Sequence, residues 1–107
     1  MPHEGEIDWI GQSDTKYHYW IYPIDTTFDA VPGNYIFAKE IRSQEFTPIY
    51  IGETGDLSER FDDHHAMPCI RRNGATHIHV HKSSEDQEVR RAEESDLIAK
   101  WSPVCNA

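Results

Sequence analysis

The stretch IYIGETGDLSERFDDHH, residues 49–65, contains in succession the patterns of a strand, a glycine turn and a helix. Asp56 stands where a helix N-cap belongs, and Glu59 three residues later completes a capping box. These signals predict a helix from about Leu57 to His65 that ends before Pro68. An arginine and a histidine would then share the apolar face of this helix, which consists of Leu57, Arg60, Phe61 and His64.

Alternating and β-branched runs predict the strands. Residues 16–24 are rich in aromatic residues and alternate, and Pro23 should end this strand or confine it to a sheet edge. Residues 34–40 and 47–53 predict an antiparallel hairpin, and residues 76–82 alternate strictly as a further strand. These patterns predict a sheet that is mostly antiparallel.

A second capping box, Ser84 with Gln87, predicts a helix over residues 85–101 that Pro103 ends. The predicted order is therefore β-β-β-α-β-α. It indicates an α+β fold in which a small, mostly antiparallel sheet of three or four strands is flanked by helices.

The composition is that of one ordinary globular domain, with 107 residues, of which 37% are hydrophobic and 27% charged. No apolar run is long enough for a membrane span, and the acidic N-terminus has no signal core. We therefore expect a cytoplasmic protein in which the two cysteines, Cys69 and Cys105, are reduced thiols.

The formal net charge of −9 argues against a protein that coats nucleic acid without specificity. The charge is unevenly distributed, because residues 64–84 contain no acid but hold Arg71, Arg72, Lys82 and several histidines. One face of the molecule could therefore be electropositive. A solvated loop would give the same pattern.

The second predicted helix also carries an ionisable residue on its apolar face. In the second predicted helix, Glu94 shares a face with Leu97, Ile98 and Trp101. A buried ion pair between Arg60 and Glu94 is one explanation, and side chains that extend past the rim of the core to solvent are another. The alternative is a site for phosphodiester hydrolysis, in which arginine clamps phosphate, tyrosine positions or deprotonates water and a carboxylate holds Mg²⁺. Tyr35 and Tyr50, each within a predicted strand, would supply the tyrosines.

Five segments in order resemble the GIY-YIG nuclease family, whose members include the N-terminal catalytic domain of the excinuclease cleavage subunit and small stand-alone endonucleases. The segments are GNY (33–35), YIG (50–52), the Leu57–Arg60–His64 set, ESDLI (94–98) and PVCN (103–106). The resemblance implies that residues 33–107 form the nuclease domain. Residues 1–32 would be an acidic N-terminal extension with an edge strand.

The resemblance also implies a role for each matching residue. Tyr35 would be the general base or part of its relay, and Tyr50 would line the site near the attacking water. Arg60 would bind the scissile phosphate, and His64 would assist proton transfer. Glu94 would be the sole carboxylate ligand of Mg²⁺ or Mn²⁺, and Asn106 would hold the wall of the site.

Two residues depart from the family pattern. Asn34 replaces the usual isoleucine of the first motif, and Glu53 adds a carboxylate directly after YIG. The carboxylate of Glu53 could repel DNA or face away from it.

Histidines at 77, 79 and 81 share one face of the strand at 76–82. Histidines at this spacing can chelate zinc. A solvent-facing polar row and a protonation-sensitive DNA-facing surface are the alternatives.

Two functions remain open at this point. The first is a metal-dependent DNA endonuclease, acting in DNA repair or restriction. The second is a non-catalytic, nuclease-like module that binds nucleic acid or a protein. The acidity of the chain favours the module, or an enzyme whose protein partner supplies affinity for DNA.

Overall fold

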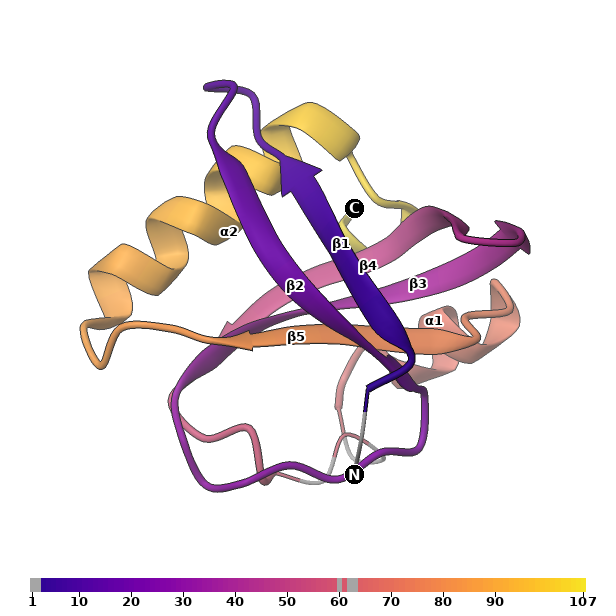
Figure 1. The fold of residues 1–107 in the computed structure, drawn as a ribbon, viewed down its shortest axis with the longest axis horizontal. Coiled ribbons are helices and arrows are strands. Elements are labelled where there is room, and N and C mark those ends of the chain that lie inside the picture. Colours follow the sequence, from indigo (N-terminus) through magenta and orange to yellow (C-terminus); the bar gives the residue numbers. More distant parts are fainter. Residues whose placement is uncertain (1–2, 60, 62–63) are drawn as a thin grey trace.

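The computed structural model describes residues 3–59, 61 and 64–107 of the chain. They form one antiparallel sheet of five strands in the order β1-β2-β5-β3-β4 (Figure 1). The elements are β1 (Gly5–Ile10), β2 (Lys16–Pro23), β3 (Gly33–Arg42), β4 (Glu45–Thr54), α1 (Met67–Arg72), β5 (His77–Lys82), α2 (Gln87–Trp101) and the 3₁₀ helix η2 (Val104–Asn106). The predicted α+β fold is confirmed.

The strand count of three or four was too low, because residues 1–32 contribute two strands to the sheet and not one. Of these, β1 is an edge strand and pairs with β2 along its whole length. Its sequence, GEIDWI, has only Ile7 and Trp9 on the inner face. So short an alternation gives a weak strand signal, and pairing with β2 supplies the missing stabilisation.

Alternation along β3 divides the core between the two faces of the sheet. Tyr35 and Phe37 belong to one apolar cluster, which includes Met67 and Ile70 from α1. Ile36 belongs to the other cluster, with Leu97 from α2. One helix therefore covers each face, and Figure 1 shows the long helix α2 crossing the sheet.

The helix predicted from Leu57 to His65 is wrong. The described residues of this segment form turns, a bend and a 3₁₀ position, and the α-helix begins at Met67 with Pro68 in its first turn. Asp56 accepts hydrogen bonds from the backbone N–H and hydroxyl of Ser58, at 2.8 and 2.5 Å, which makes a local turn. Proline suits the first helical turn because it has no N–H to leave unpaired.

The helix predicted over residues 85–101 is nearly correct, but its cap is not Ser84. The carboxylate of Asp86 accepts from the N–H of Glu88, so the helix starts two residues later, at Gln87. In the described part of the chain, no helix is long and apolar enough to cross a membrane.

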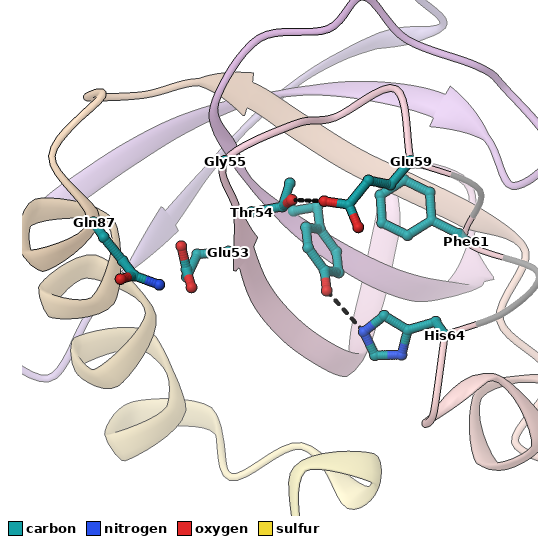
Figure 2. Close-up of a pocket in the computed structure, with 8 residues that line it drawn as sticks. Glu53, Thr54, Gly55, Glu59, Phe61, His64 and Gln87 are labelled. Atoms are coloured by element: carbon teal, nitrogen blue, oxygen red, sulfur yellow. Dashed lines mark hydrogen bonds between the residues drawn. The ribbon is translucent and has the colours of Figure 1, made fainter.

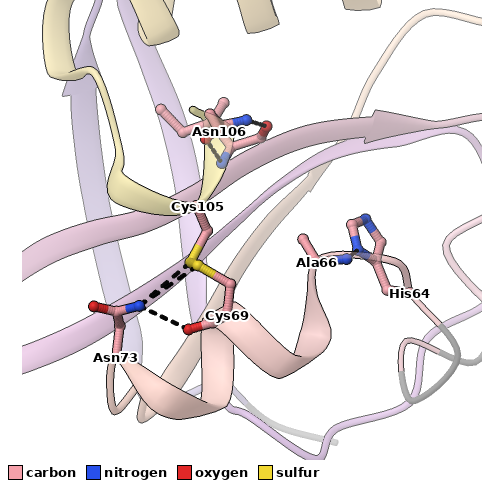
Figure 3. The surroundings of a disulfide bond; sticks show 7 residues. His64, Ala66, Cys69, Asn73, Cys105 and Asn106 are labelled. Atoms are coloured by element: carbon pink, nitrogen blue, oxygen red, sulfur yellow. Dashed lines mark hydrogen bonds between the residues drawn. A yellow bond between two sulfur atoms is a disulfide. The ribbon is translucent and has the colours of Figure 1, made fainter.

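The two cysteines are joined, which corrects the expectation of reduced thiols. The disulfide Cys69–Cys105 links α1 to η2 (Figure 3). Asn73, at the end of α1, donates its side-chain amide to the carbonyl of Cys69 at 2.8 Å. The disulfide thus anchors the C-terminal segment against one end of the sheet.

Candidate functional site

Tyr35, Tyr50 and His64 form the centre of the candidate site. Tyr35 and Tyr50 lie on neighbouring strands, as expected, with stacked rings whose centroids are 6.2 Å apart. The hydroxyl oxygen of Tyr35 lies 2.8 Å from Nε2 of His64. The centroids of the His64 and Tyr50 rings are 4.9 Å apart in a T-shaped arrangement. The fold thus brings together three of the predicted site residues.

The tautomer of His64 follows from its second hydrogen bond. The backbone N–H of Ala66 donates to Nδ1 of His64 at 3.0 Å, so this nitrogen carries the lone pair. Burial lowers the pKa of His64, and His65 nearby lowers it further, so the ring is neutral at pH 7. The proton of the neutral ring is then on Nε2, which donates to the oxygen of Tyr35.

Tyr35 is protonated at neutral pH. Burial raises its pKa well above the usual range for a phenol, and the nearby Tyr50 and Glu94 raise it further. Because His64 donates to the phenol oxygen, the hydrogen of Tyr35 remains available to another acceptor. The oxygen also keeps a second lone pair. Tyr35 can therefore donate one hydrogen bond and accept a further one in the site.

A cavity of about 680 Å³ opens beside Tyr35 and His64 (Figure 2). Its polar lining includes the carboxylates of Glu53 and Glu59, and the hydroxyl of Thr54 donates to Glu59 at 2.6 Å. The full lining is Tyr35, Glu53, Thr54, Gly55, Glu59, Phe61, His64 and Gln87. The volume is in the range of small-molecule sites, so it suffices for a nucleotide.

Glu94 approaches the tyrosines from α2. Its side chain is half-buried, and its pKa is raised by burial and then by the negative charge of Glu53. A divalent cation bound to Glu94 would stabilise the ionised carboxylate and so offset both causes of the raised pKa. No cluster of three or more His, Cys, Asp or Glu ligands exists among the described residues. A metal on Glu94 would therefore take most of its ligands from water and substrate, which is how Mg²⁺ commonly binds.

Arg60 lies outside the described residues, so neither its ion pair with Glu94 nor its place in the site is tested. Arg90 is an arginine that the structure buries beside an acid, and it was not predicted as a site residue. Its Nε donates to Glu53 at 2.9 Å, and both side chains are largely buried. Arg90 precedes Glu94 by four residues, so the two lie on the same side of the predicted helix. This spacing could have identified Arg90 as a neighbour of Glu94 from the sequence.

Arg90 also explains the two departures from the family pattern. The side-chain amide of Asn34 donates to the backbone carbonyl of Arg90 at 3.0 Å. Asn34 and Glu53, from adjacent strands, thus hold one arginine of α2. Glu53 does line the cavity, but its charge is paired with Arg90.

Asn106 holds the edge strand β4. Its Oδ1 accepts from the N–H of Ile51 at 2.8 Å, and its Nδ2 donates to the carbonyl of the same residue at 2.9 Å. Ile51 lies between Tyr50 and Gly52 in the YIG motif. The side chain of Asn106 therefore pairs with β4 as a further strand would, one residue away from Tyr50.

The histidines at 77, 79 and 81 share one face of β5, but a solvent-facing row is wrong. His79 is fully buried and its Nδ1 accepts from Nε1 of Trp9 at 3.0 Å. His81 lies 2.6 Å from the carboxylate of Glu93, which also accepts from Tyr19. These contacts place His79 and His81 in the interior between the sheet and α2, and no metal cluster is found there among the described residues.

No family model matches the chain, and no curated protein or solved structure matches it either.

Proposed function

We propose that the chain is a divalent-metal-dependent endonuclease that hydrolyses phosphodiester bonds in DNA. The observation that carries the proposal is the hydrogen bond between Tyr35 and His64, which fixes a phenol beside a cavity. The carboxylate of Glu94 does not line this cavity but lies close enough to raise the pKa of Tyr35. Phenol, imidazole and one half-buried carboxylate fit the hydrolysis of a phosphodiester better than they fit acyl transfer, which requires an activated serine or cysteine.

The roles of the protein groups follow from their protonation. Tyr35 accepts from His64 and keeps one lone pair, with which it orients an attacking water. The water oxygen bonds to phosphorus while the bond to the leaving oxygen breaks. The proton that the water loses passes to solvent, and the leaving oxygen takes up a proton from solvent, so the step balances. Tyr50 stacks on Tyr35 and restricts the motion of its ring. A divalent cation held by Glu94 would stabilise the charge that develops on the phosphate.

Arg60 is proposed as the phosphate clamp on the resemblance to the GIY-YIG family. Its guanidinium would bind the two non-bridging oxygens of the scissile phosphate. The net charge of −9 makes a protein partner that supplies affinity for DNA part of the same proposal. We propose a cytoplasmic location, in DNA repair or restriction, where the Cys69–Cys105 disulfide would be exposed to reduction.

The test is cleavage of plasmid DNA by the purified protein with Mg²⁺ or Mn²⁺. Glu94→Gln should abolish cleavage and the metal-linked rise in melting temperature, because the amide carries no charge to hold the ion. Glu45→Gln, at the exposed far end of the β3–β4 hairpin, is the matched control and should behave as the wild type does. Cleavage by Glu94→Gln at the wild-type rate would refute the metal assignment. DNA binding by the wild type without cleavage would support the non-catalytic module.

A further inference from the structure

A second cavity, of about 440 Å³, lies over β2 and the loop that follows it. Three aromatic side chains line it, and they are Trp20, Tyr22 and Phe28. Trp20 and Tyr22 alternate along β2 and lie on the sheet face of Val80, their neighbour on β5. This aromatic groove is separate from the lining of the cavity at Tyr35.

The rings of the aromatic groove are held in place although none of them is fully buried. His18 contacts Trp20 edge to face at 5.2 Å, and Tyr22 contacts Phe28 in the same way at 5.0 Å. Such contacts fix the planes of the rings before a ligand arrives. The ring of His3 already packs on this partly exposed pair, with centroids 4.7 Å from Trp20 and 6.4 Å from Tyr22. A base would take the place of His3 on the same stacking surface.

One cation and several hydrogen-bonding groups lie beside the rings. Lys82 lines the groove from the end of β5. His18 also lines it, and its hydrogen bonds to the carboxylates of Asp8 and then Glu6 raise its pKa. The same two carboxylates offset the charge of the protonated ring, so His18 adds no net positive charge to the groove. The carboxylate of Asp29 is the one acid in the lining and can accept from a base amino group. Three rings for a base, Lys82 for a phosphate and Asp29 for a base amino group match a nucleotide.

The groove is close to the candidate active site. Val80 on β5 pairs with Tyr35 on β3 at one side and with Trp20 on β2 at the other. The three residues therefore form one row across the sheet. Two inter-strand spacings separate the Cα atoms of Tyr35 and Trp20 by about 10 Å, which is about three base steps of a stacked strand. One DNA strand can therefore reach both places.

We propose that the aromatic groove binds an unpaired nucleobase of the nucleic-acid strand, stacked on Trp20 and Tyr22, with Lys82 on its phosphate. The inference rests on the proposed nuclease function and narrows its substrate to DNA that has a single-stranded or extruded base about three nucleotides from the scissile phosphate. An uninterrupted duplex presents no base face to such a groove.

The experiment measures binding of a labelled single-stranded oligonucleotide to the full chain in EDTA, so that no cleavage occurs. Trp20→Leu should weaken binding on the order of tenfold, the usual effect of one stacked base. Trp101→Leu is the matched control, because Trp101 is 39% exposed at the far end of α2, and it should bind as the wild type does. Trp20→Phe keeps a ring and should retain most of the affinity.

An abasic version of the same oligonucleotide separates stacking from charge and from misfolding. It should bind the wild type about tenfold more weakly than the intact strand, and Trp20→Leu should cause no further loss. Equal binding of intact and abasic strands by the wild type would overturn the proposal, as would an unchanged affinity in Trp20→Leu. Complete failure to bind the single strand at low salt would overturn it as well.

The two proposals fail separately. Loss of base-dependent binding in Trp20→Leu, together with no cleavage by the wild type in Mg²⁺, would support the groove and refute the nuclease. Metal-dependent cleavage by the wild type, with no effect of Trp20→Leu on binding, would support the nuclease and refute the groove.

Discussion

Gly52 on β4 lies directly beneath the phenol ring of Tyr35 on β3. The two residues pair across the hairpin, and a Cβ atom at position 52 would stand 2.5 Å from both Cζ and the hydroxyl oxygen of Tyr35. Only glycine leaves room for this ring to cross the edge strand toward His64. The glycine of the YIG motif is therefore a steric requirement of the tyrosine in the GNY motif.

Gly52→Ala should displace Tyr35 and break its hydrogen bond to His64. Because a shift of about 1 Å in a reacting group can cost on the order of 100-fold in rate, we expect cleavage to fall by that order. Gly5→Ala is the control, since its new Cβ would meet its nearest atoms at 3.6 and 3.7 Å, which is ordinary contact. Cleavage rates and thermal melts of both variants make the test. A wild-type rate in Gly52→Ala would contradict the proposed role of Tyr35.

The acid limb of the pH–rate profile should lie below pH 6.5, the usual pKa of histidine. The lowered pKa of His64 keeps the ring neutral there, and protonation at lower pH would end its acceptance of the Ala66 N–H. Activity should thus persist through pH 6.5 and fall only at lower pH. The measurement is the initial cleavage rate between pH 5 and 8.

His65→Asn sharpens this test. It removes a like charge that lowers the pKa of His64, so the acid limb should move to higher pH while the plateau rate stays unchanged. Tyr35→Phe should lower the plateau of the cleavage rate without moving the acid limb to higher pH. A limb that His65→Asn leaves in place would show that His64 does not govern it.

Reduction of the Cys69–Cys105 disulfide should lower the free energy of unfolding by about 4 kcal/mol, from the loop-entropy relation for the 36-residue separation. Denaturant titrations with and without reductant measure the difference. Cys69→Ser should show the lower stability in both conditions. If the wild type is indifferent to reductant, the disulfide does not stabilise the fold.

His79 should make the fold sensitive to mild acid. Burial, and then the nearby His77, lower its pKa to about 3, whereas an unfolded histidine titrates near 6.5. Between these values the unfolded chain binds the extra proton. Stability is therefore complete above pH 6.5 and is lost as the pH falls toward 3, by on the order of 3–5 kcal/mol in all.

The measurement is the free energy of unfolding at pH 7, 6 and 5. His79→Gln can still accept from Trp9 but cannot titrate, so its stability should change less over this range. His3→Gln, at an exposed position, should keep the wild-type slope. If the free energy of unfolding falls with pH as steeply in His79→Gln as in the wild type, His79 is not the cause of the acid sensitivity.

Local patterns in the sequence were enough for much of the fold. Alternating and β-branched runs placed β2, β3, β4 and β5, and helical periodicity with a following proline placed α2. The same patterns put Tyr35 and Tyr50 on neighbouring strands. These elements are predictable because each is long enough for its pattern to show within a local stretch of sequence. In β3 that pattern is a run of apolar residues rather than an alternation, because both faces of its first six residues are buried.

Other features depended on contacts between distant residues. The capping box at Asp56 and Glu59 resembled a helix start, but Asp56 turned to Ser58 and Glu59 to Thr54. When several hydrogen-bond partners are within reach of a side chain, the tertiary geometry decides which bond forms, and a local sequence pattern does not contain that geometry.

The tertiary structure alone decided the pairings that form the site. It chose Arg90 as the partner of Glu53, joined Cys69 to Cys105 across 36 positions, and brought His64 to Tyr35. The sequence determined which chemical groups were present, and at what spacing. Which groups meet depends on how the β3–β4 hairpin packs between the two helices, and that packing minimises a free energy summed over the whole chain.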